Sequence, residues 1–117
     1  REIVAKMFFS IQDIRQLASA GMEIACHSAN HYNLSTIEKW EKVVAEVCDS
    51  KNLIEAVSGV PIKYFVYPAG GKEGYTPEIT RLVTKNYQAA FITGTQKELC
   101  GPNDSIYELP RLHEKYF

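Results

Sequence analysis

The sequence has no long hydrophobic run, no surplus of charge of either sign and few cysteines, and each absence excludes a class of protein. Its 117 residues carry 13 Lys and Arg against 14 Asp and Glu, a formal net charge of −1. A nucleic-acid-binding protein gathers basic residues into a patch, whereas here they are scattered, so we expect no nucleic-acid partner. No apolar run approaches the roughly 18 residues that a transmembrane helix requires, so we expect no membrane span.

The three cysteines, Cys26, Cys48 and Cys100, are an odd number and too few for a disulfide-stapled scaffold. We interpret them as thiols that pack as small apolar side chains. Hydrophobic residues make up 45% of the chain and charged residues 23%, which is ordinary globular composition. We therefore expect a single domain, residues 1–117, built around one core.

Three segments carry the signals of a helix start, and apolar residues at helical spacing follow each of them. The starts are predicted capping boxes at residues 10–13 and 35–38 and an N-cap followed by proline at residues 76–77. Gly21 is expected to end the first helix, and the second, much longer helix is expected to end at residues 58–61.

Four short apolar runs alternate with these helices and are predicted strands: residues 22–26, 64–67, 88–93 and 106–109. Strands separated by helices imply right-handed crossovers and a parallel sheet. So few strands cannot close a barrel. The expected fold is therefore α/β, a partial distorted (β/α) barrel with parallel strands and flanking helices. Its unpaired sheet edges also lead us to expect self-association.

Two histidines four residues apart, His27 and His31, lie in the stretch IACHSANHYNLS, directly after the first predicted strand. α/β folds place ligand sites on loops at the carboxyl ends of parallel strands. Asn30 and Asn33 argue against a helix through the pair, but a loop can also bring two imidazoles onto one cation. The spacing alone leaves open a second interpretation, a polar loop that merely contains histidines.

A second loop at the same end of the predicted sheet begins in the stretch FVYPAGG, residues 65–71. Loops rich in glycine and proline let backbone N–H groups approach a ligand, and Tyr67 could offer its aromatic face to a sugar ring. Tyr67, Pro68 and Gly70 are therefore the candidate substrate-binding residues. The alternative is a sharp strand-to-loop turn with Tyr67 half buried.

Taken in order, the stretches GMEIACHSANHYNLS, FVYPAGG, YQAAFITG and YELPRL resemble the polysaccharide deacetylase (NodB homology) domain. The resemblance covers residues 10–112. It implies a metal-dependent hydrolase that removes N-acetyl groups from a polysaccharide containing N-acetylglucosamine. His27 and His31 match the metal-binding histidines of that family, and the implied cofactor is zinc, with cobalt or nickel as alternatives. The resemblance also suggests a location in the cell envelope or outside the cell.

The same resemblance implies three further site residues. The position of Ala69 lends its backbone N–H to the oxyanion, and Arg111 matches a position that orients the catalytic base. A surface salt bridge is the alternative for Arg111. His113 is a candidate for the general acid, because Leu112-His113 faintly echoes the late motif of the family.

The chain departs from the family pattern where the catalytic base and third metal ligand should be, because it contains no Asp-Asp pair. We interpret it as the later part of a deacetylase domain, with the strand that bears the aspartates outside residues 1–117. Weak metal affinity and little turnover are then expected from these residues alone. The alternative is a non-catalytic (β/α) domain that binds a glycan or a partner chain, with Tyr32, Tyr67 and Tyr75 as stacking surfaces. A third interpretation is an α/β fold with no connection to glycans.

Overall fold

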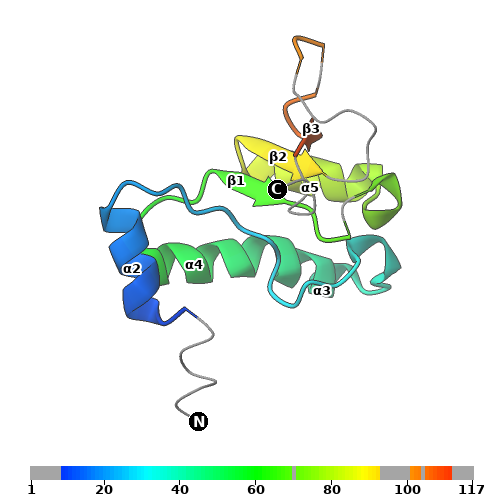
Figure 1. Cartoon of the computed structure of the whole chain (residues 1–117). Coiled ribbons are helices and arrows are strands. Elements are labelled where there is room, and N and C mark those ends of the chain that lie inside the picture. The colour runs from blue at the N-terminus through cyan, green and yellow to red at the C-terminus, as the bar shows by residue number, and fades with distance from the viewer. Residues whose placement is uncertain (1–8, 70, 93–100, 104, 112–117) are drawn as a thin grey trace.

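The computed structural model describes residues 9–69, 71–92, 101–103 and 105–111, and Figure 1 shows how helices and short strands alternate along them. In chain order the elements are α2 (Ile11–Ser19), the 3-10 turn η1 (Leu34–Thr36), α3 (Trp40–Val44), the π-helical stretch η2 (Ala45–Asp49), α4 (Ser50–Ser58), β1 (Tyr64–Val66), the 3-10 turn η3 (Lys72–Gly74), α5 (Pro77–Asn86), β2 (Ala89–Ile92) and β3 (Leu109–Pro110). No helix in the described ranges is long and apolar enough to cross a membrane.

The strands form a three-stranded parallel sheet in the order β1-β2-β3. Tyr64 of β1 aligns with Ala89 of β2, and Phe91 of β2 aligns with Leu109 of β3. The connection between β1 and β2 carries α5 (Pro77–Asn86), and parallel neighbours require a long crossover of this kind. The α/β class and the parallel sheet predicted from the sequence are therefore confirmed.

The first apolar run, residues 22–26, does not form the predicted strand. Only Cys26 joins the sheet, through an isolated parallel bridge to Phe65 at the outer edge of β1. Met22 at the start of the run is 60% exposed, so this part of the run has little surface to pack against and its backbone pairing does not extend.

The last predicted strand, residues 106–109, is shifted toward the C-terminus. The Glu108 N–H donates to the Ser105 carbonyl and closes a turn, so that β3 begins only at Leu109. Ile106 is 55% exposed, although its carbonyl accepts the Ala90 N–H of β2 at 2.9 Å. The turn at residues 105–108 thus carries a first backbone bond to the sheet, and the strand itself begins after it.

The long helix begins later than the sequence predicts. The Asn33 side chain accepts the Ser35 N–H, which places Ser35 inside the 3-10 turn η1 instead of at a helix N-cap. The backbone stays extended as far as Lys39, and α3, η2 and α4 then run without a break to Ser58. Gly59 ends the helix in the left-handed conformation, with φ 76°.

The predicted starts of the other two helices are confirmed. Ser10 and Asp13 form a reciprocal capping box at α2. Thr76 caps α5 by accepting the Ile79 N–H, and Pro77 occupies the first turn. Side-chain caps of this kind satisfy N–H groups that have no partner within the helix.

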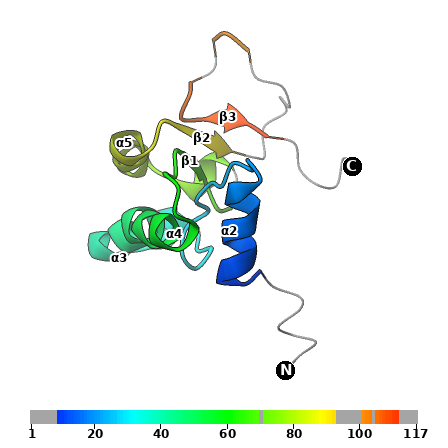
Figure 2. The same ribbon diagram turned by 90° about the vertical axis from the view of Figure 1, so that its left-hand side faces the viewer.

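The core lies between the sheet and the helices, and Figure 2 shows the long helix and α5 on the same side of the strands. Its buried apolar residues are Cys26, Leu34, Val43, Val47, Ile62, Phe65, Tyr67, Tyr75, Ile79, Val83, Tyr87, Ala90 and Ile92. Side chains alternate between the two faces of a strand. The opposite face therefore carries Tyr64, Val66 and Phe91, which are only half buried.

Candidate functional site

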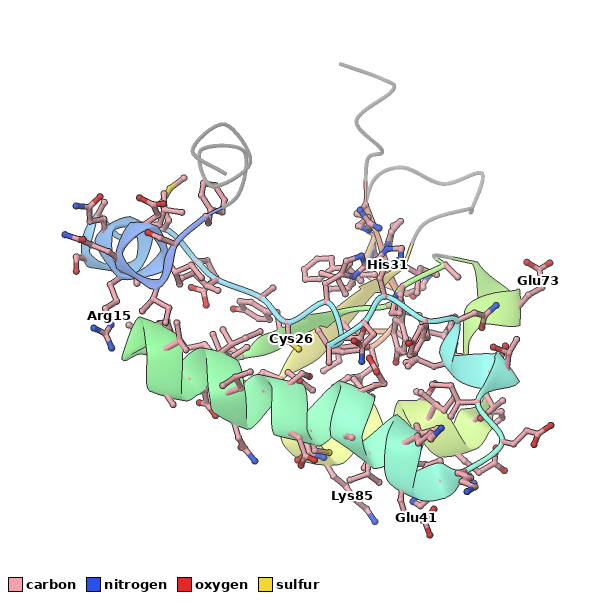
Figure 3. The ribbon with its side chains drawn as sticks, turned by 90° about the horizontal axis from the view of Figure 1, so that it is seen from below. Arg15, Cys26, His31, Glu41, Glu73 and Lys85 are labelled. Atoms are coloured by element: carbon pink, nitrogen blue, oxygen red, sulfur yellow. The ribbon has the colours of Figure 1, made fainter. Side chains whose placement is uncertain are left out.

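The two histidines of the loop that follows Cys26 lie against each other. The ring centroids of His27 and His31 are 4.7 Å apart, and the rings meet edge to face at 74°. Figure 3 shows His31 in the half of the molecule that also holds Glu73, away from Arg15. The loop thus brings together the two imidazoles that the spacing singled out, whereas metal ligation by them stays a prediction.

One ring nitrogen of His27 is already engaged by the sheet. His27 Nδ1 lies 2.7 Å from the carbonyl oxygen of Val66, the last residue of β1. Because a carbonyl can only accept, Nδ1 carries the proton and Nε2 keeps its lone pair. Metal-binding histidines are commonly oriented in this way by a hydrogen bond at their second nitrogen.

Burial lowers the pKa of His27, and the neighbouring His31 and Arg111 lower the pKa further, whereas the hydrogen bond to Val66 acts in the opposite direction. The lowered pKa favours the neutral imidazole near neutral pH. Only that form can bind a cation through Nε2. The electrostatics of His27 therefore agree with its proposed role.

The backbone of the histidine loop is held in an unusual conformation. Ser28 and His31 both lie in the left-handed region, with φ 61° and 58°. Such conformations are uncommon for residues other than glycine and persist where surrounding contacts fix them. One such contact is local, since the Ser28 hydroxyl accepts the His31 N–H at 3.0 Å.

The other contact comes from Glu46 in η2, a residue that the sequence analysis did not single out. Its carboxylate accepts the N–H groups of Ala29 and Asn30 at 2.9 and 2.8 Å, and also the side-chain amide of Asn30. The Glu46 side chain is 4% exposed. In the sequence, Glu46 is a charged residue within the apolar stripe of the long helix, between Val43 and Val47. This position could have identified Glu46 as a functional residue.

The second loop at this end of the sheet corrects one of the predictions. Tyr67 and Pro68 are fully buried, and the Tyr67 ring stacks on Tyr75 with centroids 4.4 Å apart. Tyr67 therefore presents no open face to a sugar, because its ring belongs to the core. The neighbouring candidate Gly70 lies outside the described residues.

Ala69 is exposed next to these buried residues, and its φ of 62° turns the backbone sharply. Within the described part of the chain, its N–H donates to no other group, which agrees with the predicted role as an oxyanion donor. A Cβ on Gly74 would lie 3.0 Å from the Pro68 carbonyl, so any larger residue there would press the turn away from η3.

The two loops are tied to each other and to the end of the sheet. The Ser35 hydroxyl donates to the Glu73 carbonyl, which links η1 to η3. Arg111, just after β3, donates its backbone N–H to Ile92 at 3.0 Å. Its Nε is buried without a partner within the described residues. The last candidate, His113, lies outside the described residues.

In the described part of the chain, the potential metal ligands that come together are His27 and His31. Among the described residues, no group of three His, Cys, Asp or Glu could hold a metal ion. Cys26, next to His27, has its buried thiol 3.1 Å from the Ser50 hydroxyl, so it points into the core. A metal site at His27 and His31 would therefore need further ligands from outside the described residues.

An open hollow of about 600 Å³ lies beside the histidine loop. Its lining residues are Asn30, Tyr32, Thr36, Ile37, Glu38, Lys39, Lys42, Ala45 and Glu46. Neither histidine is among them. Tyr32, which is 56% exposed, keeps the accessible ring that burial removes from Tyr67 and Tyr75.

Solved structures of deacetylases share this fold. The chain superimposes on a polysaccharide deacetylase from Bacillus cereus with a TM-score of 0.73 at 23% identity, over 89% of this chain and 32% of that one. A Streptococcus pyogenes deacetylase in complex with acetate gives 0.76 at 18% identity, over 89% and 44%. A CE4 family pseudoenzyme from Bacillus anthracis gives 0.61 at 17% identity, over 70% and 28%.

The chain thus spans less than half the length of each of these structures, and its fold is common to enzymes and pseudoenzymes. A search of curated proteins gives no match. The family model for polysaccharide deacetylase matches residues 5–91, most of the chain. The chain therefore belongs to the polysaccharide deacetylase family.

Proposed function

We propose that this chain forms the metal-binding part of an N-deacetylase that acts on a polysaccharide containing N-acetylglucosamine. The observation that carries the proposal is the contact of the two imidazoles, at 4.7 Å, with His27 held through Nδ1 so that Nε2 is available. Zinc is the cation that we expect, with cobalt or nickel as alternatives, because neutral imidazole suits all three.

Each described residue of the site has a distinct role in this proposal. His27 and His31 would hold the cation, which would supply Lewis-acid chemistry to polarise the acetamide carbonyl and activate a water molecule. The exposed N–H of Ala69 donates to the oxyanion that forms on the acetyl carbon. The unpartnered Nε of Arg111 is suited to orient a carboxylate that acts as base.

That carboxylate and the third ligand have to come from residues outside the described ones. A catalytic zinc normally has three protein ligands and one open position, and the described residues supply two. Polysaccharide is the expected substrate from family membership, and acetate is the expected product. We propose a location in the cell envelope or outside the cell on the same ground.

A non-catalytic glycan-binding domain is the second candidate. It is favoured by the two-ligand site and by the similarity of the fold to a CE4 family pseudoenzyme. Tyr32 would then be the stacking residue, because it is the exposed tyrosine beside the hollow. Self-association through the outer edge of the sheet, where only Cys26 pairs with β1, remains a proposal.

Titration calorimetry with zinc, cobalt and nickel tests the first candidate, with a His27→Ala, His31→Ala double variant as control. We expect binding by the unmodified chain and none by the double variant. Acetate release from chitin oligomers is expected to be low for residues 1–117. It is expected to rise when an upstream strand with adjacent aspartates is present. Metal-independent binding of oligomers without acetate release would support the second candidate instead.

A further inference from the structure

We propose that Glu46 is the positioning residue of the histidine site, because its buried carboxylate holds the backbone of the histidine loop in the conformation that brings His31 onto His27. This inference rests on the proposed metal-binding function. Glu46 touches neither imidazole in the structure, and it acts through the backbone of Ala29 and Asn30.

The hydrogen bonds of Glu46 converge on the segment between the two histidines. Oε2 accepts the consecutive N–H groups of Ala29 and Asn30, and Oε1 accepts the Asn30 side-chain amide. Consecutive backbone N–H groups that point at one anion form a nest, which in other proteins binds phosphate or other anions. Here the anion is a side chain of the same protein.

The nest lies between the two left-handed residues of the loop. Ser28 (φ 61°) precedes the two N–H groups and His31 (φ 58°) follows them. The bonds to Glu46 fix the two peptides that lie between Ser28 and His31. The His31 N–H is bonded to the Ser28 hydroxyl instead, so Glu46 acts on the position of His31 through these intervening peptides. Ala29 and Asn30 are exposed, and the other bonds of the loop, His31 to Ser28 and His27 to Val66, lie on either side of them. Glu46 therefore supplies the bonds that hold the middle of the loop.

The helix in turn holds Glu46 in place. The π-helical stretch η2 is supported by two hydroxyls, since Ser50 donates to the Glu46 carbonyl and Tyr87 donates to the Val47 carbonyl. π-helical turns inside α-helices occur frequently at functional sites. Among the described residues, Glu46 forms no ion pair within 4.0 Å, so its buried carboxylate is balanced by the three N–H donors of the loop.

The chain offers a matched control on the same helix. Glu55 of α4 also accepts a backbone N–H from a following loop, that of Ile62 at 3.1 Å. It is partly buried and also pairs with Lys51 at 3.7 Å. Its loop leads into the opposite end of β1, so removal of its carboxylate removes a structural bond without touching the histidine loop.

The test compares Glu46→Leu and Glu46→Gln with Glu55→Leu in the full chain, with cobalt binding followed by calorimetry and absorbance. We expect Glu46→Leu to weaken binding about 10- to 100-fold, as loss of an outer-shell partner does in other metal sites. Glu46→Gln, which keeps one acceptor oxygen, is expected to lose less. Glu55→Leu is expected to bind cobalt as the unmodified chain does. Binding by both Glu46 variants within about twofold of that chain would overturn the proposal.

Amide hydrogen exchange separates this proposal from the metal-binding proposal. In the absence of metal, Glu46→Gln is expected to speed exchange at Ala29 and Asn30, whereas Glu55→Leu is expected to speed it only at Ile62. If the unmodified chain binds no cobalt, the metal site is wrong, and the exchange rates still report on the loop. Unchanged exchange at Ala29 and Asn30 in Glu46→Gln would overturn the role of Glu46, including the case in which Glu46→Leu does not fold.

Discussion

The histidine loop and the loop after β1 lie at the same end of the sheet, yet different forces hold them. In the histidine loop, polar bonds from Glu46 and Ser28 fix an exposed backbone. In the second loop, the buried Tyr67 stacks on Tyr75 and the turn packs closely under Gly74. The histidine loop depends on individual hydrogen bonds, and these bonds orient its polar groups. The second loop is part of the core, so truncation of its buried side chains should lower the stability of the whole fold.

The largest effect on stability is expected from Tyr67→Ala. Truncation of a buried aromatic side chain costs about 3–5 kcal/mol, through lost burial and the cavity that remains. Urea unfolding should show this loss. Tyr32→Ala, at a position that is 56% exposed, is the control and should change the unfolding free energy by less than about 0.5 kcal/mol. Equal losses in the two variants would contradict the contrast between the loops.

The next effect should be seen in metal binding rather than in stability. His31→Ala removes an exposed side chain and one of the two ligands, so we expect unchanged urea unfolding and an affinity for cobalt at least about 100-fold weaker, roughly 2.7 kcal/mol. His27→Ala should lose affinity to a similar extent and some stability as well, because His27 is half buried and bonded to Val66. Retained cobalt affinity in His31→Ala would contradict the proposed ligand pair.

A smaller effect is expected from alkaline pH, and of the two loops it should involve the second. Burial also raises the pKa of Tyr87 in the core, so Tyr87 adds to the effect. Burial raises the pKa of Tyr67 to about 12, whereas a tyrosine in an unfolded chain ionises near pH 10. The unfolded state therefore loses its proton first, so the stability that Tyr67 contributes is complete below pH 10 and is lost as the pH rises to about 12.

Absorbance of tyrosinate and urea unfolding between pH 9 and 12 measure this effect. Tyr67→Phe keeps the ring and removes the ionisable hydroxyl, so we expect its stability to fall less steeply over the same range. The same slope in both proteins would show that other groups cause the alkaline loss. In either case, the exposed histidine loop should not contribute to the loss of stability between pH 9 and 12.

Much of the fold could be predicted from local signals. The caps at Ser10 and Thr76 were predicted correctly because each depends only on residues within one turn. The capping box at residues 35–38 was wrong, since Asn33 competes for the same N–H group two residues earlier. The strand at residues 22–26 was wrong because pairing depends on a neighbouring strand, which no local pattern reports.

The site could be predicted less completely than the fold. The spacing of the histidines indicated that they could meet, but Glu46 was missed because its partners lie 16 and 17 residues away in the sequence. Tyr67 was predicted to bind a sugar ring because it begins a glycine- and proline-rich loop at the end of a strand, with a half-buried turn as the alternative. The side on which its ring lies is decided by Tyr75, which packs against it from the far end of the loop.

Because Gly74 has no side chain, the backbone of η3 lies close to the peptide bond that carries the Ala69 N–H. A Cβ on Gly74 would lie 3.0 Å from the Pro68 carbonyl, so the peptide that precedes Ala69 lies directly against the backbone of η3. Two backbones in contact leave no rotamer to adjust, so the turn is rigid. If the Ala69 N–H is the proposed oxyanion donor, this rigidity would hold its direction before a substrate binds.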